Sequence, residues 1–171
     1  DYVRAVRKGI GDCKTPGNYA ASLYGSEEAK KMGYTQVLWL DAIHQKFIEE
    51  VGTMNIFIRF KDEIATPNLT GAILPGITRA SVIHLLKHKG ENITERLIDI
   101  QEVIDSFENG TLLEVFGTGT AAVISSVGVL GYKDKKMILN EFEAGKFAAS
   151  LYDEITGIQY GEKPDLFNWL V

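Results

Sequence analysis

The chain has 171 residues, of which 45% are hydrophobic and 24% charged, and its 18 basic and 23 acidic side chains give a net charge of −5. This apolar content is enough for a packed core and excludes global disorder, and the length fits one domain. The acidic balance disfavours nucleic acid as the main partner, because proteins that bind the phosphate backbone are usually basic. The single cysteine cannot form an internal disulfide, which favours a reducing compartment such as the cytoplasm.

No apolar run approaches the roughly 20 residues needed to cross a bilayer, and no secretory signal opens the chain. We therefore expect no membrane partner. The chain begins at Asp1 rather than at methionine, which suggests a fragment cut from within a longer protein.

The first elements follow an aperiodic, glycine-containing stretch over residues 1–16. Helical spacing of apolar residues then predicts a helix with Asn18 as its N-cap and Gly33 just beyond its C-terminus. Residues 37–40 form a continuous apolar run, which is typical of a buried strand.

The middle of the chain predicts strands followed by a helix. Residues 41–46 indicate a hairpin turn, after which a further strand leads to Glu50. Residues 54–60 alternate strictly between two faces, which is the period-two signature of a strand. A tight turn at residues 75–76 precedes a helix that ends at Gly90.

The second half of the chain predicts a similar mixture. Strands are expected at residues 93–98, at 112–116 and, with a turn near Gly128, over 121–132. Helices are expected at 100–107 and, from apolar residues at helical spacing, between Ala144 and Ile155. No repeat or linker divides the chain, so these elements predict one mixed α/β domain.

Two motifs suggest other chemistry and are set aside. Residues 9–15 look like a phosphate-binding P-loop, but Cys13 stands immediately before Lys14, where that motif requires glycine. His84 and His88 have a spacing that zinc can use on a helix, but no glutamate follows the first histidine as a metalloprotease helix requires. We therefore predict neither a nucleotide hydrolase nor a metal site.

Two glycine-containing turns are suited to binding anions. The turn at residues 74–78 opens a helix, whose free N–H groups and dipole attract negative charge. Residues 117–122 follow a strand and offer hydroxyls and N–H groups for a second anion cradle. With Lys14 in a loop and Glu50 at a strand end, these groups suit a cofactor that has a phosphate, an aldehyde and a basic ring nitrogen. Ordinary tight turns and surface side chains are the alternative.

A longer pattern then identifies a family. The segment GDCKTPGNYAASL at residues 11–23 is followed in order by QVLWL at 36–40, EVGTMNIF at 50–57, LPGITR at 74–79, EVFGTGTA at 114–121 and IQYGE at 158–162. These blocks resemble the branched-chain amino acid aminotransferases, which are class IV, fold type IV enzymes dependent on pyridoxal phosphate. The resemblance implies a single α+β domain, with a curled sheet or pseudo-barrel and outer helices. It also implies that residues 1–171 are the C-terminal cofactor-binding domain and that the N-terminal domain is absent from this chain.

The resemblance assigns roles by position. Lys14 matches the lysine that forms an aldimine with the cofactor and shuttles the substrate α-proton. Glu50 matches the carboxylate that pairs with the ring nitrogen, and its neighbour Glu49 is expected to be an ordinary surface acid. Tyr19 matches the hydrogen-bonding partner of the phenolic oxygen, and Leu74 the residue that packs on the ring face.

The remaining matches concern the phosphate and the substrate. Ile77, Thr78 and Thr120 match the phosphate-binding residues of the family. Thr53, Ala121 and Ala122 match groups near the substrate α-carboxylate, although strand packing is the alternative for the two alanines. Pro16 departs from the family, which usually has glycine there. Ala122 and Ser125 replace a redox cysteine pair of mammalian members, so that regulation is expected to be absent.

The resemblance implies transamination of leucine, isoleucine and valine with 2-oxoglutarate by ping-pong chemistry. It further implies a homodimeric, cytoplasmic parent protein, and a fragment with weak or no activity alone. Two related class IV enzymes, the D-amino acid aminotransferases and the aminodeoxychorismate lyases, remain alternatives. A non-catalytic binding or oligomerisation module is the alternative from another class.

Overall fold

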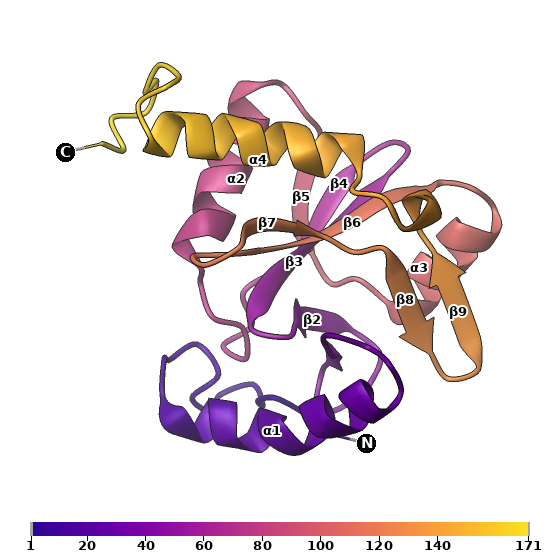
Figure 1. The fold of residues 1–171 in the computed structure, drawn as a ribbon. Coiled ribbons are helices and arrows are strands. Elements are labelled where there is room, and N and C mark those ends of the chain that lie inside the picture. The colour runs from indigo at the N-terminus through magenta and orange to yellow at the C-terminus, as the bar shows by residue number, and fades with distance from the viewer. Residues whose placement is uncertain (1, 171) are drawn as a thin grey trace.

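A seven-stranded sheet forms the centre of the chain in the structure, a computed structural model that describes residues 2–170 (Figure 1). The strands are β1 (Leu38–Leu40), β2 (Ile48–Val51), β3 (Met54–Phe60), β4 (Ile64–Pro67), β5 (Ile93–Arg96), β6 (Leu112–Gly119) and β7 (Val123–Ser126), and β8 (Val129–Tyr132) and β9 (Lys135–Ile138) form a separate hairpin. The helices are α1 (Pro16–Lys31), α2 (Ile77–His88), α3 (Ile100–Glu108) and α4 (Lys146–Gln159), with a 3-10 turn at Asn140–Phe142.

Strand β3 organises the sheet. It pairs with β6 along its length and with β2 and β4 near its two ends, always antiparallel, whereas β4 and β5 are parallel. The sheet has edge strands β1, β5 and β7, so it does not close into a barrel. This open sheet is the mixed α/β single domain expected from the sequence.

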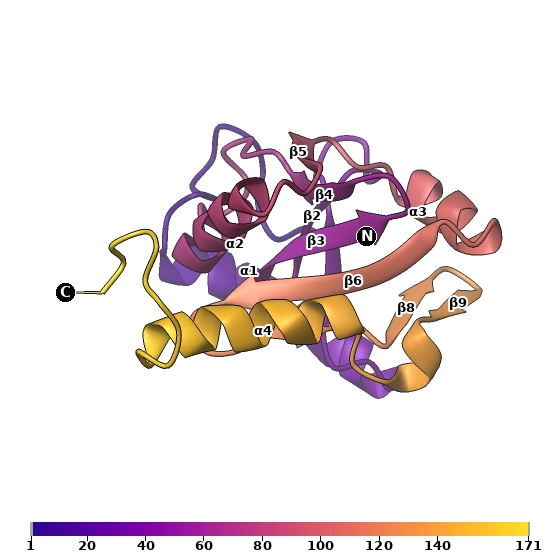
Figure 2. The same ribbon diagram turned by 90° about the horizontal axis from the view of Figure 1, so that it is seen from above.

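The alternation predicted for residues 54–60 divides the core into two layers. Ile56, Ile58 and Phe60 face a cluster built from α3 and the β8–β9 hairpin. Phe57 faces the opposite cluster, which contains residues of α2 and α4, and its ring stacks on Phe116 of β6 with centroids 5.3 Å apart. Figure 2 shows α4 running along β6 on this second face.

Helix α1 lies apart from the other helices, beside β1 and β2 (Figure 1). Its contact with the sheet is close, because a Cβ atom on Gly25 would lie 3.0 Å from the indole of Trp39. Most of its remaining side chains are exposed, including Tyr19, Leu23 and Tyr24. This end of the molecule therefore presents an open, partly aromatic surface.

The start of α1 differs from the prediction. The helix begins at Pro16 with Thr15 as N-cap, so Asn18 is inside the first turn and is not the cap. The fixed φ of proline suits the first helical position, and the Asn18 amide donates backwards to the carbonyls of Ile10 and Cys13, at 2.7 and 3.0 Å. The predicted C-terminus is confirmed, since Gly33 adopts a φ of +85° directly after the C-cap.

The glycine-containing segment after residue 116 also differs. It was expected to be a turn, but Gly117, Thr118 and Gly119 continue β6 and pair with β7, leaving only residues 120–122 as the turn. A Cβ on Gly117 would lie 2.9 Å from the Met54 side chain, so close strand packing explains that glycine. Strands β4 and β9 were not predicted, and Ala144 lies just before α4 rather than within it.

Within residues 2–170, every helix is too short or too polar to cross a membrane.

Candidate active site

Several connections converge at one end of the sheet. Asn55, which follows the β2–β3 turn, pairs with Thr118 near the end of β6. The Asn55 amide donates to the Leu74 carbonyl at 2.8 Å, and a Cβ on Gly76 would lie 2.2 Å from Asn55 Oδ1. The loop before α2 and the turns β2–β3 and β6–β7 therefore lie together, because paired residues join them.

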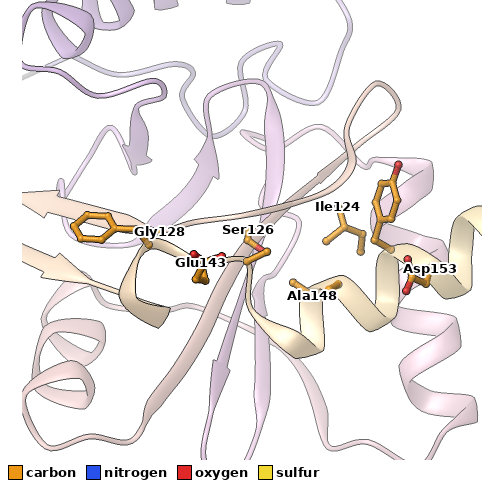
Figure 3. A pocket seen from close by; sticks show the side chains of 10 residues that line it. Ile124, Ser126, Gly128, Glu143, Ala148 and Asp153 are labelled. Atoms are coloured by element: carbon orange, nitrogen blue, oxygen red, sulfur yellow. The ribbon is translucent and has the colours of Figure 1, made fainter.

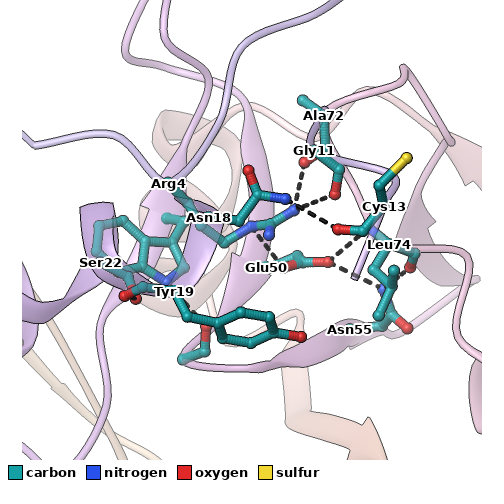
Figure 4. A network of polar contacts seen from close by, with 12 residues as sticks. Arg4, Gly11, Cys13, Asn18, Tyr19, Ser22, Glu50, Asn55, Ala72 and Leu74 are labelled. Atoms are coloured by element: carbon teal, nitrogen blue, oxygen red, sulfur yellow. Dashed lines mark hydrogen bonds and ion pairs between the residues drawn. The ribbon is translucent and has the colours of Figure 1, made fainter. Parts of the chain in front are cut away.

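Glu50 on β2 has several polar partners at this end (Figure 4). The residue is 3% exposed, and its Oε2 lies 2.7 Å from Nε of Arg4. The backbone N–H of Leu74 donates to Oε1 at 2.9 Å, with the Asn55 amide at 3.4 Å. The loop of residues 72–74 is thus tied directly to the end of β2.

Burial raises the pKa of Glu50 to about 7, against the opposing effects of the Arg4 guanidinium and the Leu74 N–H. Glu49 increases the shift through its own negative charge. A carboxyl group with a pKa near neutrality can exchange a proton with a basic partner at physiological pH. Glu50 therefore has the environment expected of a functional carboxylate.

Glu49 is not the surface acid expected from the sequence. It is 4% exposed because all four residues of β2 are buried, and its Oε2 has no hydrogen-bond partner among residues 2–170. Burial, followed by the charge of Asp41, raises the pKa of Glu49 to about 7, while Arg4 and Arg7 oppose the shift. The positive charge of Arg4 thus acts on two adjacent buried carboxyl groups, those of Glu49 and Glu50.

A small cavity beside Glu50 collects four of the predicted site residues. Tyr19, Glu50, Thr53 and Leu74 line it, and its volume of about 20 Å³ holds no more than about one water molecule. Tyr19 covers it from the outside with a side chain that is 39% exposed. Four further lining residues were not predicted, namely Arg4, Asn18, Ser22 and Gly52.

The N-terminus of α2 offers groups that are suited to binding an anion. No side chain caps this helix. Its first intrahelical hydrogen bond runs from the Ala80 N–H to the Gly76 carbonyl at 3.0 Å, so the backbone N–H groups of residues 77–79 are available to a ligand. The Ile77 side chain is 84% exposed, which leaves its backbone as the useful group. Thr118 is 1% exposed and opposite Asn55, and its hydroxyl has no partner within the described chain.

The three residues of the β6–β7 turn lie at the same end but do not line the cavity. Thr120 and Ala121 are exposed and Ala122 is half-buried. The last ladder pair, Gly119 with Val123, sets the turn immediately beyond the sheet. The contacts predicted for these three residues with phosphate and substrate would therefore be made at the solvent-exposed edge of the site.

Lys14 lies on the loop directly before α1. The Cys13 N–H donates to the Ile10 carbonyl at 3.0 Å, and Asn18 holds the same two residues from inside the helix. The Lys14 side chain is exposed, and its Nζ forms no hydrogen bond or ion pair within residues 2–170. The loop is therefore fixed, while the amine stays available for a partner.

The chemistry of this donor set fits pyridoxal phosphate. Free helix N–H groups and the unpartnered Thr118 hydroxyl suit a phosphate. The buried Glu50 carboxylate suits a protonated ring nitrogen, and the Tyr19 hydroxyl suits a phenolic oxygen. The unengaged amine of Lys14 suits an aldehyde. The residues present therefore offer one partner for each polar part of that cofactor.

Two other features of the surface lie outside this site. A hollow of about 450 Å³ between β7 and α4 is lined by small and acidic side chains such as Ala148, Glu143 and Asp153 (Figure 3), none of which was predicted to bind a ligand. His84 and His88 both pack against Phe167, with ring centroids 4.6 and 5.2 Å apart. No cluster of three or more possible metal ligands occurs among residues 2–170.

Comparison with known proteins points to one family. Residues 4–128 match the family model described as amino-transferase class IV. The chain is 55% identical over 169 residues to branched-chain-amino-acid aminotransferase 2 of Bacillus subtilis, covering 99% of the chain and 47% of that protein. Overall, the chain spans about half the length of the curated relatives it matches.

Solved structures agree with this match. The branched-chain amino acid aminotransferase from Escherichia coli aligns with a TM-score of 0.82 at 30% identity, over 100% of the chain and 54% of that structure. The branched-chain amino acid aminotransferase from Thermobaculum terrenum, in its PLP-form (holo-form), aligns with a TM-score of 0.79 at 26% identity, over 100% of the chain and 52% of that structure.

Proposed function

The chain belongs to the class IV aminotransferases, and from this premise we propose that its parent protein transfers the amino group of leucine, isoleucine or valine to 2-oxoglutarate. The products are the branched 2-oxo acid and glutamate. Because the chain covers 48% of a relative at 52% identity, we assign it the role of the C-terminal, cofactor-binding domain. The rest of the substrate pocket then belongs to the missing part.

One observation carries this proposal. A buried carboxylate, Glu50, is held by Arg4 and the Leu74 N–H beside a cavity that Tyr19 covers. A buried carboxylate held in a fixed orientation beside a cavity is the kind of group needed to bind a protonated ring nitrogen.

The chain's own residues divide the work. When bound, pyridoxal phosphate supplies an aldehyde that exchanges amino groups and a ring that stabilises negative charge at the substrate α-carbon. Nζ of Lys14 removes the proton from the α-carbon of the amino-acid donor. In the second half of the reaction, it returns a proton to the α-carbon derived from 2-oxoglutarate. Glu50 keeps the proton on the ring nitrogen, and Tyr19 orients the phenolic oxygen.

The other predicted residues bind and orient. The backbone N–H groups of Ile77 and Thr78, with the Thr120 hydroxyl, would hold the phosphate at the positive end of the α2 dipole. Thr53, Ala121 and Ala122 would bind the substrate carboxylate. Leu74 would pack on the ring.

We further propose a homodimeric parent protein in the cytoplasm, where its one cysteine is compatible with reducing conditions. The partners are small amino and 2-oxo acids. A D-amino acid aminotransferase or an aminodeoxychorismate lyase is the alternative within class IV, and glutamate formation from L-leucine but not from D-alanine distinguishes the proposed activity from the first of them. A non-catalytic module is excluded if bound cofactor turns over with substrate.

The decisive experiment is borohydride reduction of the full-length protein after loading with pyridoxal phosphate, followed by peptide mass mapping. We expect one adduct, on Lys14, which disappears in Lys14→Ala. Lys61→Ala is the matched control, because Lys61 is also exposed but lies at the far end of β3. Label scattered over many lysines in the wild type, with no preference for Lys14, overturns the proposal.

A further inference from the structure

The side chain of Arg4 lies at the centre of the polar network in Figure 4. Its Nη2 donates to the carbonyls of Gly11 and Ala72, at 2.9 and 2.5 Å. Its Nε lies 2.7 Å from Oε2 of Glu50. Arg4 is only 9% exposed, so all three contacts are shielded from water.

Each of these contacts reaches a different segment of the site. Gly11 lies three residues before Lys14, and Ala72 lies two residues before Leu74. A Cβ on Gly11 would lie 2.6 Å from both Cα and O of Ala72, so the two loops touch through their backbones. Glu50 comes from β2, the third segment. Arg4 thus contacts three of the segments that carry predicted cofactor residues.

We propose that Arg4 is the positioning residue of the cofactor site, holding the Lys14 loop, the Leu74 loop and the Glu50 carboxylate in one fixed arrangement. The inference rests on the proposed function in that the cofactor is taken to be a pyridoxal phosphate derivative. Arg4 acts through Glu50 and the two loops, without touching the substrate.

The physical case depends on the shape and the charge of the side chain. A planar guanidinium presents donors in several fixed directions, whereas a lysine ammonium is a point charge that cannot serve two carbonyls and a carboxylate in the same geometry. Arg4 also opposes the pKa shift that burial imposes on Glu50, while Glu49 adds to that shift. Loss of Arg4 therefore removes the largest effect that favours ionisation of each of these two buried carboxyl groups.

The test measures noncovalent binding of pyridoxamine 5'-phosphate by the full-length protein, using equilibrium dialysis between pH 5.5 and 9. This probe carries an amine instead of an aldehyde, so it forms no bond to Lys14. We expect the affinity of the wild type to fall as the pH drops through about 7, where Glu50 takes up a proton. In Glu50→Gln, this part of the pH dependence disappears.

Arg4→Met is expected to weaken binding about 10-fold or more at neutral pH, as is typical for residues that orient a ligating side chain. It also moves the midpoint of the pH dependence upward by about one pH unit or more, because Glu50 stays protonated longer. Arg4→Lys keeps the positive charge. Its pH midpoint is therefore expected to lie closer to that of the wild type, but its affinity is expected to stay low. Arg7→Met, which removes a positive charge from an exposed neighbour, leaves both unchanged.

A second variant separates positioning from folding. Arg4→Met leaves the buried Glu50 carboxylate without its ionic partner and lowers the midpoint temperature of thermal unfolding of the apo protein. Arg4→Met combined with Glu50→Gln removes both partners and recovers much of that midpoint temperature. If folded Arg4→Met bound the probe as tightly as the wild type, Arg4 would be merely structural and the inference would be overturned. An unshifted pH midpoint in Arg4→Met would overturn it as well. If the wild type does not bind pyridoxamine 5'-phosphate, that result overturns the proposed function instead.

Discussion

Two buried glutamates at opposite ends of the sheet have similar burial but different surroundings. Glu50 on β2 is 3% exposed and Glu114 on β6 is 6% exposed. Each lies near an arginine, with Arg4 at 2.7 Å from Glu50 and Arg59 at 3.7 Å from Glu114. Burial and an ionic partner therefore do not distinguish a functional carboxylate from a structural one.

The difference lies in how the oxygens are used. Oε1 and Oε2 of Glu114 accept the N–H groups of Phe147 and Ala148, at 2.9 and 3.0 Å, at the start of α4. A Cβ on Gly145 would lie 2.0 Å from Oε2, so helix and carboxylate are in contact on that side too. Glu114 anchors a helix to the sheet. Glu50 instead borders a cavity, and an exposed tyrosine separates it from solvent.

The largest expected effect is on stability at the Glu114 end. Glu114→Ala leaves two helix N–H groups without their acceptor and removes the carboxylate near Arg59, which costs about 3 kcal/mol or more of unfolding free energy. Urea denaturation measures this cost, with Glu143→Ala as the exposed control. Cofactor affinity of the folded protein is expected to stay within twofold of wild type. A loss below about 1 kcal/mol would show that Glu114 is not the anchor.

The opposite pattern is expected at the other end. Glu50→Gln weakens binding of pyridoxal phosphate by about 10- to 100-fold, equivalent to about 1.4–2.7 kcal/mol, because the amide cannot hold a positive charge on the ring nitrogen. Spectrophotometric titration measures the affinity, and urea denaturation of the apo protein supplies the comparison. A larger change in stability than in affinity would erase the distinction between the two glutamates.

The pH dependence of stability sharpens the comparison further. The pKa of Glu49 is raised from 4.5 to about 7, so the folded chain binds more protons than the unfolded chain between these values. The unfolding free energy of the apo protein should therefore fall as the pH rises from about 4.5 to about 7, by on the order of 2 kcal/mol. Glu50 contributes in the same direction.

Glu49→Gln should flatten this decline when urea denaturation is repeated across the pH range. Glu143→Gln is the control, because its side chain is exposed. Asp41 acts in the opposite sense at lower pH. Burial raises its pKa, but four backbone N–H donors outweigh that effect and lower it to about 2, so its contribution is lost only in strong acid. Stability that rises with pH between 5 and 7 would contradict the burial of Glu49.

The smallest expected effect concerns Tyr19. Tyr19→Phe removes one hydroxyl at the rim and should weaken pyridoxal phosphate binding about fivefold, near 1 kcal/mol, with no loss of stability. Tyr24→Phe on the same helix is the matched control, since Tyr24 is also exposed but does not line the cavity. Equal effects of the two substitutions would remove Tyr19 from the site.

Elements with a clear period were predicted from the sequence. The alternation over residues 54–60 gave both β3 and the division of the core, because its two faces bury different clusters. The cap of α1 was misassigned because Asn18 satisfies loop carbonyls rather than helix N–H groups. The end of β6 was missed because glycine was interpreted as a turn signal, when the packing of Met54 requires it.

The site was predicted through the resemblance of the chain to a family rather than through periodicity. Tyr19, Glu50, Thr53 and Leu74 line one cavity, but Arg4 was not identified, since it lies in an aperiodic stretch. Its contacts join residues far apart along the chain, and no local pattern encodes them. The burial of Glu49 was missed for the same reason, because β2 is covered on both faces and lacks alternation.

The chain contains two tryptophans, and their positions allow intrinsic fluorescence to report on ligand binding. Trp39 is 1% exposed and donates its indole N–H to the Gly52 carbonyl at 2.9 Å, in the turn beside the cavity. Trp169 stacks on Phe167, with ring centroids 4.5 Å apart, near the other terminus. In Trp169→Phe, the remaining tryptophan emission of residues 1–171 comes from Trp39, so a red shift or a change in lifetime when ligand is added reports directly on the Gly52 turn.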